Sequence, residues 1–266
     1  MRGRGLDFAE LRHYQDGDDV RAIDWRATAR LSTPYVRVYT EERDRAVLLI
    51  VDQRLSMFFG SQRATKSVSA AEAAALAAWR IDHAGDRVGA IVFDDHERAV
   101  VRPARGTTTV QRVLSEAARL NGALRADAGP SDPGALNRAL AEAARLATHD
   151  WLVVLISDAA GADATSTRLV STIAAHNDVI AIFVFDPVEA DLPQLGSVVV
   201  AEGAARLAID TGITTLRSGF ADDFAARRAA VANFGRHRAI PVIEVCTDAD
   251  AGYQIRAALQ AHRPTA

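Results

Sequence analysis

The feature of the sequence that most restricts its fold is a regular alternation of short apolar runs with alanine-rich segments after about residue 45. The apolar runs are rich in valine, isoleucine and leucine, and they cover residues 46–51, 87–93, 151–156, 179–185 and 240–245. Short, continuously apolar runs are typical of strands that are buried on both faces of a sheet. Between them lie stretches with apolar residues at helical spacing, at 66–83, 109–120, 134–147 and 165–176. This order predicts an α/β fold with a mostly parallel sheet and helices on both faces.

Composition limits the class of protein further. The chain has 266 residues, of which 49% are hydrophobic, enough for a substantial core. Its 31 basic and 34 acidic residues are interspersed, which argues against an electrostatic binder of nucleic acid or membranes. Cys246 is the only cysteine, so the chain forms no internal disulfide and suits a reducing compartment. No apolar stretch reaches the length of about 18 residues that spans a bilayer, so we expect a soluble, cytoplasmic protein.

The first 45 residues follow a different pattern. Asp7 stands three residues before Glu10, which is the spacing of a helix-capping box, so we predict a short helix over residues 7–14. Residues 35–39 alternate between apolar and polar side chains, as in a strand with one face in solvent.

Residues 17–30 are dense in aspartate and arginine. The charges balance in sign, with arginines at 21, 26 and 30 and aspartates at 16, 18, 19 and 24. Balanced charges favour internal ion pairs over a charged partner surface, and Trp25 is expected to serve as a packing anchor. We therefore predict that residues 1–45 form an extension packed on an α/β body of residues 46–266.

Two of the apolar runs end in the same way, with Asp52 after the first and Asp158 after the third. If these strands are neighbours in a parallel sheet, both carboxylates lie at the same edge and face each other. Close carboxylates repel, so either one of them is protonated or a cation lies between them. The alternative is that each aspartate only caps the turn or helix that follows it.

The segment after the first run resembles a known metal site. Asp52-x-Arg54-x-Ser56 is similar to the Asp-x-Ser-x-Ser opening of the von Willebrand factor A fold, and Asp158 matches a second aspartate of that fold. The resemblance implies a metal-ion-dependent adhesion site, in which serine, threonine and aspartate oxygens hold Mg²⁺. In relatives that bind the metal, an acidic residue of the partner protein completes the coordination.

A longer motif narrows this resemblance to one family. The stretch GRGLDFAELRHYQDGDDVRAIDWRATAR, Gly3 to Arg30, closely resembles the signature of a bacterial family known as domain of unknown function 58. The similarity continues through residues 35–52, through SMFFG with Lys66 downstream, and through residues 85–95. The resemblance implies a von Willebrand factor A-like, Rossmann-like fold. It also implies a non-catalytic protein-binding role, as an adaptor or chaperone-assisting partner of a MoxR-type AAA+ ATPase.

Two positions depart from the metal-binding pattern. Arg54 stands where the first serine is expected, and the segment 131–140, which matches the threonine-bearing loop, contains no threonine. Gly134 takes the threonine position, with Ser131 as a possible substitute nearby.

These departures predict a degenerate adhesion site. Arginine is permanently cationic and its planar fork suits carboxylates, so we expect Arg54 to replace the ion between Asp52 and Asp158. No metal is then expected; if Mg²⁺ does bind, its ligands are Asp52, Ser56 and Asp158. The alternative is that Arg54 points to solvent and the site is empty. If its guanidinium is not consumed by the two aspartates, Arg54 can instead bind a carboxylate of the partner directly.

A function of another class is a metal-dependent hydrolase or phosphatase that uses Asp52 and Asp158. Such chemistry needs a further ligand or a general base, and the sequence identifies neither. The segment 60–67 differs from a phosphate-binding loop at Thr65, where a glycine is required, so we expect a surface loop there.

Two further segments, at 94–95 and 197–209, carry weaker structural signals. Residues 197–201 and 205–209 are apolar enough to form additional strands. Asp94 and Asp95 are expected to lie in a solvated turn that leads from the run 87–93 into a hairpin; the alternative is that they add a third acidic element near the edge of the sheet.

Overall fold

The structure, a computed structural model, describes residues 6–41, 45–127, 129, 131–202, 205–234 and 240–261. The chain divides into two compact units, Met1–Asp44 and Arg45–Ala266. In the described part of the chain, no helix has both the length and the apolar character needed to cross a membrane.

The N-terminal unit is built on an antiparallel ribbon of β1 (Leu6–His13) and β2 (Tyr35–Glu41). Between the strands lie the 3-10 turn η1 (Val20–Ala22) and the short helix α1 (Trp25–Leu31). The strand at 35–39 is therefore confirmed, whereas the helix predicted over 7–14 is wrong. Pairing with the alternating residues of β2 outweighs the local capping pattern, which is a weak signal without an apolar helix face behind it.

Ion pairs tie this unit together internally, although not by the predicted arginines. Arg12 pairs with Asp18 at 2.7 Å, and Arg37 pairs with Asp24 at 2.8 Å. The arginines at 21, 26 and 30 make no ion pair with another described residue. Trp25, expected as a packing anchor, is 67% exposed.

The body contains a sheet of six strands in the order β10-β7-β6-β3-β4-β5. All neighbouring pairs are parallel except β4 and β5, so only the β5 edge runs in the opposite direction. The strands are β3 (Ala46–Asp52), β4 (Arg87–Phe93), β5 (Arg98–Ala104), β6 (Leu152–Ser157), β7 (Asp178–Phe185) and β10 (Val242–Cys246). The five predicted central strands and the hairpin after the second are confirmed.

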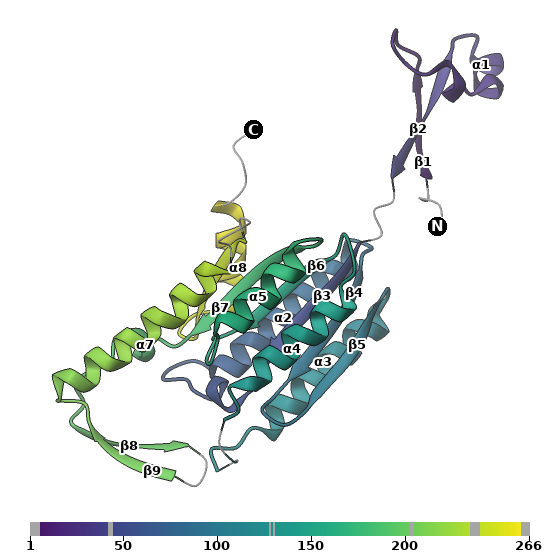
Figure 1. Cartoon of the computed structure of the whole chain (residues 1–266). Coiled ribbons are helices and arrows are strands. Elements are labelled where there is room, and N and C mark those ends of the chain that lie inside the picture. The colour runs from purple at the N-terminus through teal and green to yellow at the C-terminus, as the bar shows by residue number, and fades with distance from the viewer. Residues whose placement is uncertain are drawn as a thin grey trace. The chain divides into compact units, whose positions relative to one another are not determined.

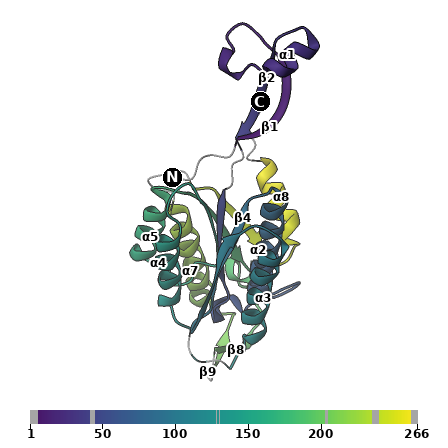
Figure 2. The same cartoon turned by 90° about the vertical axis from the view of Figure 1, so that its right-hand side faces the viewer.

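Helices cover both faces of this sheet (Figure 2). One layer consists of α2 (Lys66–His83), α3 (Thr107–Ala123) and α8 (Ala251–Ala261), and the other of α4 (Gly134–Leu146), α5 (Ala164–Ala174) and α7 (Thr214–Asn233). Alternate residues of β3 pack on opposite layers, because Val47, Leu49 and Val51 belong to one apolar cluster and Leu48 and Ile50 to the other. The α/β fold class is thereby confirmed.

The remaining elements gather where the parallel strands end. They are the 3-10 turn η2 (Leu55–Met57), the short helix α6 (Pro187–Ala190) and an antiparallel ribbon of β8 (Ser197–Glu202) and β9 (Ala205–Asp210). The ribbon forms a separate sheet beyond the carboxyl ends of the central strands (Figure 1). The two additional strands predicted from the sequence are confirmed.

Candidate functional site

The topology brings the two strand-end aspartates together. β3 and β6 are adjacent and parallel, with Val51 opposite Ile156. Asp52 is the last residue of β3, Asp158 directly follows β6, and both side chains are fully buried. Both carboxylates therefore lie at the carboxyl edge of the sheet, where parallel α/β folds place their ligand sites.

Arg54 lies beside these two carboxylates and does not point to solvent. Its side chain is 1% exposed. Its Nε donates to Asp52 Oδ1 at 3.0 Å, and its Nη2 donates to Asp52 Oδ2 at 2.6 Å. The same Nη2 lies 3.7 Å from Asp158 Oδ1. The guanidinium thus binds Asp52 in two-point geometry and forms a longer ion pair with Asp158.

The loop after β6 completes the surroundings of this guanidinium. The chain turns sharply there, with positive φ angles of 55° at Ala159 and 72° at Gly161. Within this turn the Ala160 carbonyl accepts a hydrogen bond of 3.0 Å from Arg54 Nη1. The condition for Arg54 to bind a partner carboxylate is therefore not met, since its donors are engaged inside the protein.

Two serines support the aspartates. Ser56 Oγ donates to Asp158 Oδ1 at 3.4 Å, so the predicted site residues do meet, although by a long hydrogen bond. Ser157, the last residue of β6, donates from Oγ to Asp52 Oδ2 at 2.7 Å. Asp158 Oδ1 also accepts from the Ala160 backbone N–H at 2.9 Å, which fixes its orientation.

Lys66 also belongs to the site, although the sequence analysis mentions it only within the family resemblance and assigns it no role there. It is the first residue of α2 and is only 2% exposed, and its Nζ donates to Asp158 Oδ2 at 2.8 Å and to Glu189 at 2.7 Å. Helical spacing places Lys66 on the same face as Ala70 and Ala73, which are buried. A lysine on the buried face of a helix requires a carboxylate partner, and that signal was present in the sequence.

Further ion pairs extend from Glu189 toward the surface. Arg227 of α7 donates from Nη2 to Glu189 at 3.1 Å and from Nε to Asp223 at 2.9 Å. Opposite charges therefore alternate along one connected series, which we call the ion-pair chain. It consists of Asp52, Arg54, Asp158, Lys66, Glu189, Arg227 and Asp223.

The pairing of Asp158 with Lys66 keeps both side chains charged. Burial would by itself raise the pKa of Asp158, but the positive charges of Lys66 and Arg54 outweigh it and hold that pKa well below its usual range. Burial would likewise lower the pKa of Lys66, but Asp158 and Glu189 outweigh it and raise that pKa.

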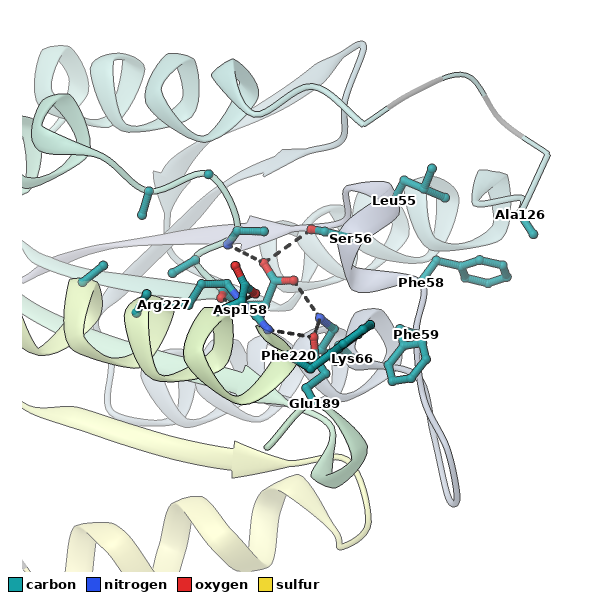
Figure 3. A pocket seen from close by; sticks show the side chains of 17 residues that line it. Leu55, Ser56, Phe58, Phe59, Lys66, Ala126, Asp158, Glu189, Phe220 and Arg227 are labelled. Carbon is teal, nitrogen blue, oxygen red and sulfur yellow. Dashed lines mark hydrogen bonds and ion pairs between the residues drawn. The ribbon is translucent and has the colours of Figure 1, made fainter. Parts of the chain in front are cut away.

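A pocket of 610 Å³ opens above the ion-pair chain. Its polar lining includes Ser56, Lys66, Asp158, Glu189, Asp223 and Arg227. Lys66 lies between Asp158 and Glu189, with Arg227 on the far side of Glu189 (Figure 3). The exposed side chains of Phe58, Phe59 and Phe220 line the same pocket. The site therefore combines apolar rings with charges that are already paired.

The two aspartates after β4 differ in their exposure to solvent. Asp94 accepts from the backbone of His96 and Glu97, as expected of a turn residue. Asp95 is only 8% exposed and accepts from the Leu55 backbone N–H at 2.6 Å, so placing it in a solvated turn was wrong. Its other oxygen accepts from Ser131 Oγ at 3.0 Å. Asp95 thus links the η2 turn to the loop before α4.

The residues at the carboxyl edge do not fit the Mg²⁺ ion that the resemblance implies. Mg²⁺ requires oxygen ligands in near-octahedral order. Both oxygens of Asp52 accept from Arg54, one oxygen of Asp158 accepts from Lys66, and Gly134 offers no side chain. Among the described residues, no group of three or more histidine, cysteine, aspartate or glutamate side chains is arranged to hold a metal.

Comparison with solved structures supports the fold. The BatB protein of Bacteroides thetaiotaomicron is similar, with 15% identity and a TM-score of 0.50 over 82% of this chain and 97% of that one. A von Willebrand factor type A protein of Catenulispora acidiphila aligns with 17% identity and a TM-score of 0.42, over 76% of this chain and 45% of that one. At 15% identity the likeness to BatB concerns the fold alone.

Comparison of sequences shows the family. An uncharacterised protein of Mycobacterium tuberculosis is 33% identical over 253 residues, which cover 93% of this chain and 77% of the relative. The family model described as "Protein of unknown function DUF58" matches residues 10–230. The chain therefore belongs to the DUF58 family, and its body is an α/β fold with a mostly parallel six-stranded sheet between two layers of helices.

Proposed function

We propose that this protein is a non-catalytic interaction module whose protein partner docks at the carboxyl edge of the six-stranded sheet. One observation carries the proposal. The pocket at that edge exposes phenylalanine rings above a buried ion-pair chain whose cations are all engaged by carboxylates. Exposed aromatic rings around a concave site are typical of surfaces that bind other proteins.

The partner that we propose is a MoxR-type AAA+ ATPase, beside which this protein acts in the cytoplasm as an adaptor or co-chaperone. The support for this partner is the family resemblance of the signature between Gly3 and Arg30. The degenerate adhesion site of Asp52, Arg54, Ser56 and Asp158 then serves as a fixed support for the docking surface, with no metal ion.

The hydrolase alternative finds no observation in its favour. A metal-dependent hydrolase would need oxygens of Asp52 and Asp158 to bind the metal. Arg54 and Lys66 engage these carboxylates instead.

Direct binding tests the proposal. A purified MoxR-type ATPase is titrated against the immobilised full-length protein with ATP present, and the affinity is compared with that of Phe59→Ser. Tyr253→Ser is the matched control, because Tyr253 is 68% exposed on α8 and does not line the pocket. We expect Phe59→Ser to weaken binding at least about tenfold, as truncation of a buried aromatic contact does.

Other results of these experiments would contradict the proposal. If the ATPase does not bind, the proposed partner is wrong. If Phe59→Ser and Tyr253→Ser weaken binding of the ATPase equally, the partner does not dock at the carboxyl edge of the sheet. A screen of phosphatase and esterase substrates with divalent metals tests the non-catalytic role. Turnover that disappears in Asp52→Ala would make the protein an enzyme.

A further inference from the structure

The ion-pair chain contains more carboxylates than cations. Its four carboxylates and three cations give a net charge of −1. Each cation lies between two carboxylates, so a carboxylate stands at each end of the chain. The inner end, Asp52, is fully buried and accepts three hydrogen bonds from the side chain of Arg54.

The outer end is the member that a partner can reach. Among the charged side chains of the pocket, the exposed fractions are 2% for Lys66, 0% for Asp158, 14% for Glu189 and 13% for Arg227. The Asp223 side chain is 69% exposed and lines the same pocket. A ligand that enters the pocket therefore meets an exposed carboxylate, while Lys66 is buried, Arg227 is largely covered, and both cations are paired.

The aromatic lining agrees with this polarity. Phe58, Phe59 and Phe220 are 39%, 42% and 40% exposed around the pocket. Arginine and lysine carry a long apolar stem with a charged tip, and a cation is attracted to the face of an aromatic ring. A glutamate or aspartate of the partner would instead bring a like charge against Asp223 and Glu189.

We infer that the pocket binds a basic side chain of the partner protein, with the cationic tip at Asp223 and the stem against the phenylalanine rings. This inference rests on the proposed function and specifies the chemistry of its partner. The basic side chain of the partner would be a fourth cation beside the three of the ion-pair chain, and it would balance the net charge of that chain. In the metal-bearing relatives, an acidic residue of the partner meets a bound cation. Here the charges are reversed, because a basic residue of the partner would meet a carboxylate of the site.

The test uses two capped pentapeptides that differ only in the central residue, which is arginine or glutamate flanked by leucines. Each is titrated into the full-length protein, and backbone amide shifts are followed by NMR. We expect saturable shifts at residues 56–61 and 220–227 with the arginine peptide only. Asp223→Asn should weaken that binding about tenfold, whereas Asp222→Asn, which changes an exposed neighbour outside the pocket, should not.

A charge reversal separates recognition from a structural effect. Asp223→Lys should shift the preference from the arginine to the glutamate peptide while the unfolding midpoint stays unchanged. Stronger binding of the glutamate peptide to the unmodified protein overturns the inferred polarity but leaves docking at this edge intact. If neither peptide shifts these amides, the pocket is not a side-chain site. The proposed function is then tested separately, by the effect of Phe59→Ser on binding of the ATPase.

Discussion

Arg54 is an arginine buried at the edge of a sheet, where its charge is compensated by Asp52. Moving a charge out of water is costly unless a partner of opposite charge and further hydrogen bonds compensate. Asp52 supplies the charge, the Ala160 carbonyl takes a further N–H, and the ring of Phe93 lies 5.7 Å from the guanidinium carbon. The same reasoning predicts what happens when either charge is removed alone.

Arg54→Met should lower the free energy of unfolding by about 3–5 kcal/mol, because it leaves Asp52 buried without its cation. The double variant Asp52→Asn with Arg54→Met should recover part of that loss, which urea denaturation measures. Arg125→Met is the control, since the Arg125–Asp127 pair is exposed and its removal should change stability little. Additive losses in the double variant would show that Arg54 and Asp52 are not energetically coupled.

Calorimetric titration with Mg²⁺ and Mn²⁺ should give no micromolar binding. The physical reason is that Arg54 and Lys66 already neutralise the carboxylates that a divalent ion would need. Removal of divalent ions with a chelator should accordingly leave the unfolding midpoint unchanged. Micromolar affinity that disappears in Asp158→Asn would contradict the role of Arg54 as a substitute for the ion.

Acid should weaken the contribution of Lys66. The folded protein depresses the pKa of Asp158, so the pairing stabilises the protein fully above the unfolded-state pKa of about 4 and less as the pH falls below it. The loss of stability caused by Lys66→Met should therefore be smaller at pH 3 than at pH 6. Chemical denaturation at the two pH values measures it, and Arg125→Met should show little loss at either. A loss that is the same at both would mean that Lys66 does not set the charge of Asp158.

The sequence identified part of this site and missed the rest for a physical reason. Asp52 and Asp158 follow from strand ends alone, and Ser56 and Arg54 follow from the resemblance to the Asp-x-Ser-x-Ser motif. Glu189, Arg227 and Asp223 come from α6 and α7, and their meeting with Lys66 depends on how these elements pack. Local pattern carries no information about such distant contacts.

The elements were predictable where periodicity was strong. The predicted helix over 66–83 matches α2 because its alanine-rich face is buried against the sheet. No helix was predicted for α7, since its apolar residues do not gather on one face and Val231 is its only buried residue. At β1 the sequence offered a capping pattern, and cross-strand pairing with β2 prevailed.

The loop between η2 and α2 is an element whose shape depends on one buried carboxylate. Asp186 accepts from the backbone and the hydroxyl of Ser61, at 2.8 and 2.7 Å, and from Thr247. The loop turns tightly at Gly60, where a Cβ would lie 2.0 Å from the Ala64 carbonyl oxygen. These contacts hold the segment that carries Phe58 and Phe59.

Asp186→Asn should therefore release this loop. We expect faster amide hydrogen exchange at residues 58–62, because the backbone N–H of Ser61 loses its charged acceptor. Thr247→Val, which removes one neighbouring hydroxyl and leaves the bonds from Ser61, should have a smaller effect. Exchange that is unchanged in Asp186→Asn would show that the loop is held by other contacts.

At the scale of the whole molecule, the body contains its own core. Both apolar clusters consist of residues from the unit Arg45–Ala266, on the two faces of the sheet. A fragment of residues 45–266 should therefore fold by itself and unfold in one cooperative transition, which circular dichroism measures. A fragment without cooperative unfolding would show that the N-terminal unit is needed for folding. The packing of that unit on the body stays a prediction from the sequence.

The ion-pair chain also restricts how this protein can change during evolution. Each inner member balances two neighbours, so a single substitution leaves a buried charge without compensation, and only paired exchanges avoid that loss. Replacing Arg54 by the serine of the metal-binding pattern would need a threonine at position 134 and release of Asp158 from Lys66 as well. A single substitution at Arg54 would therefore not turn this edge of the sheet into a metal site.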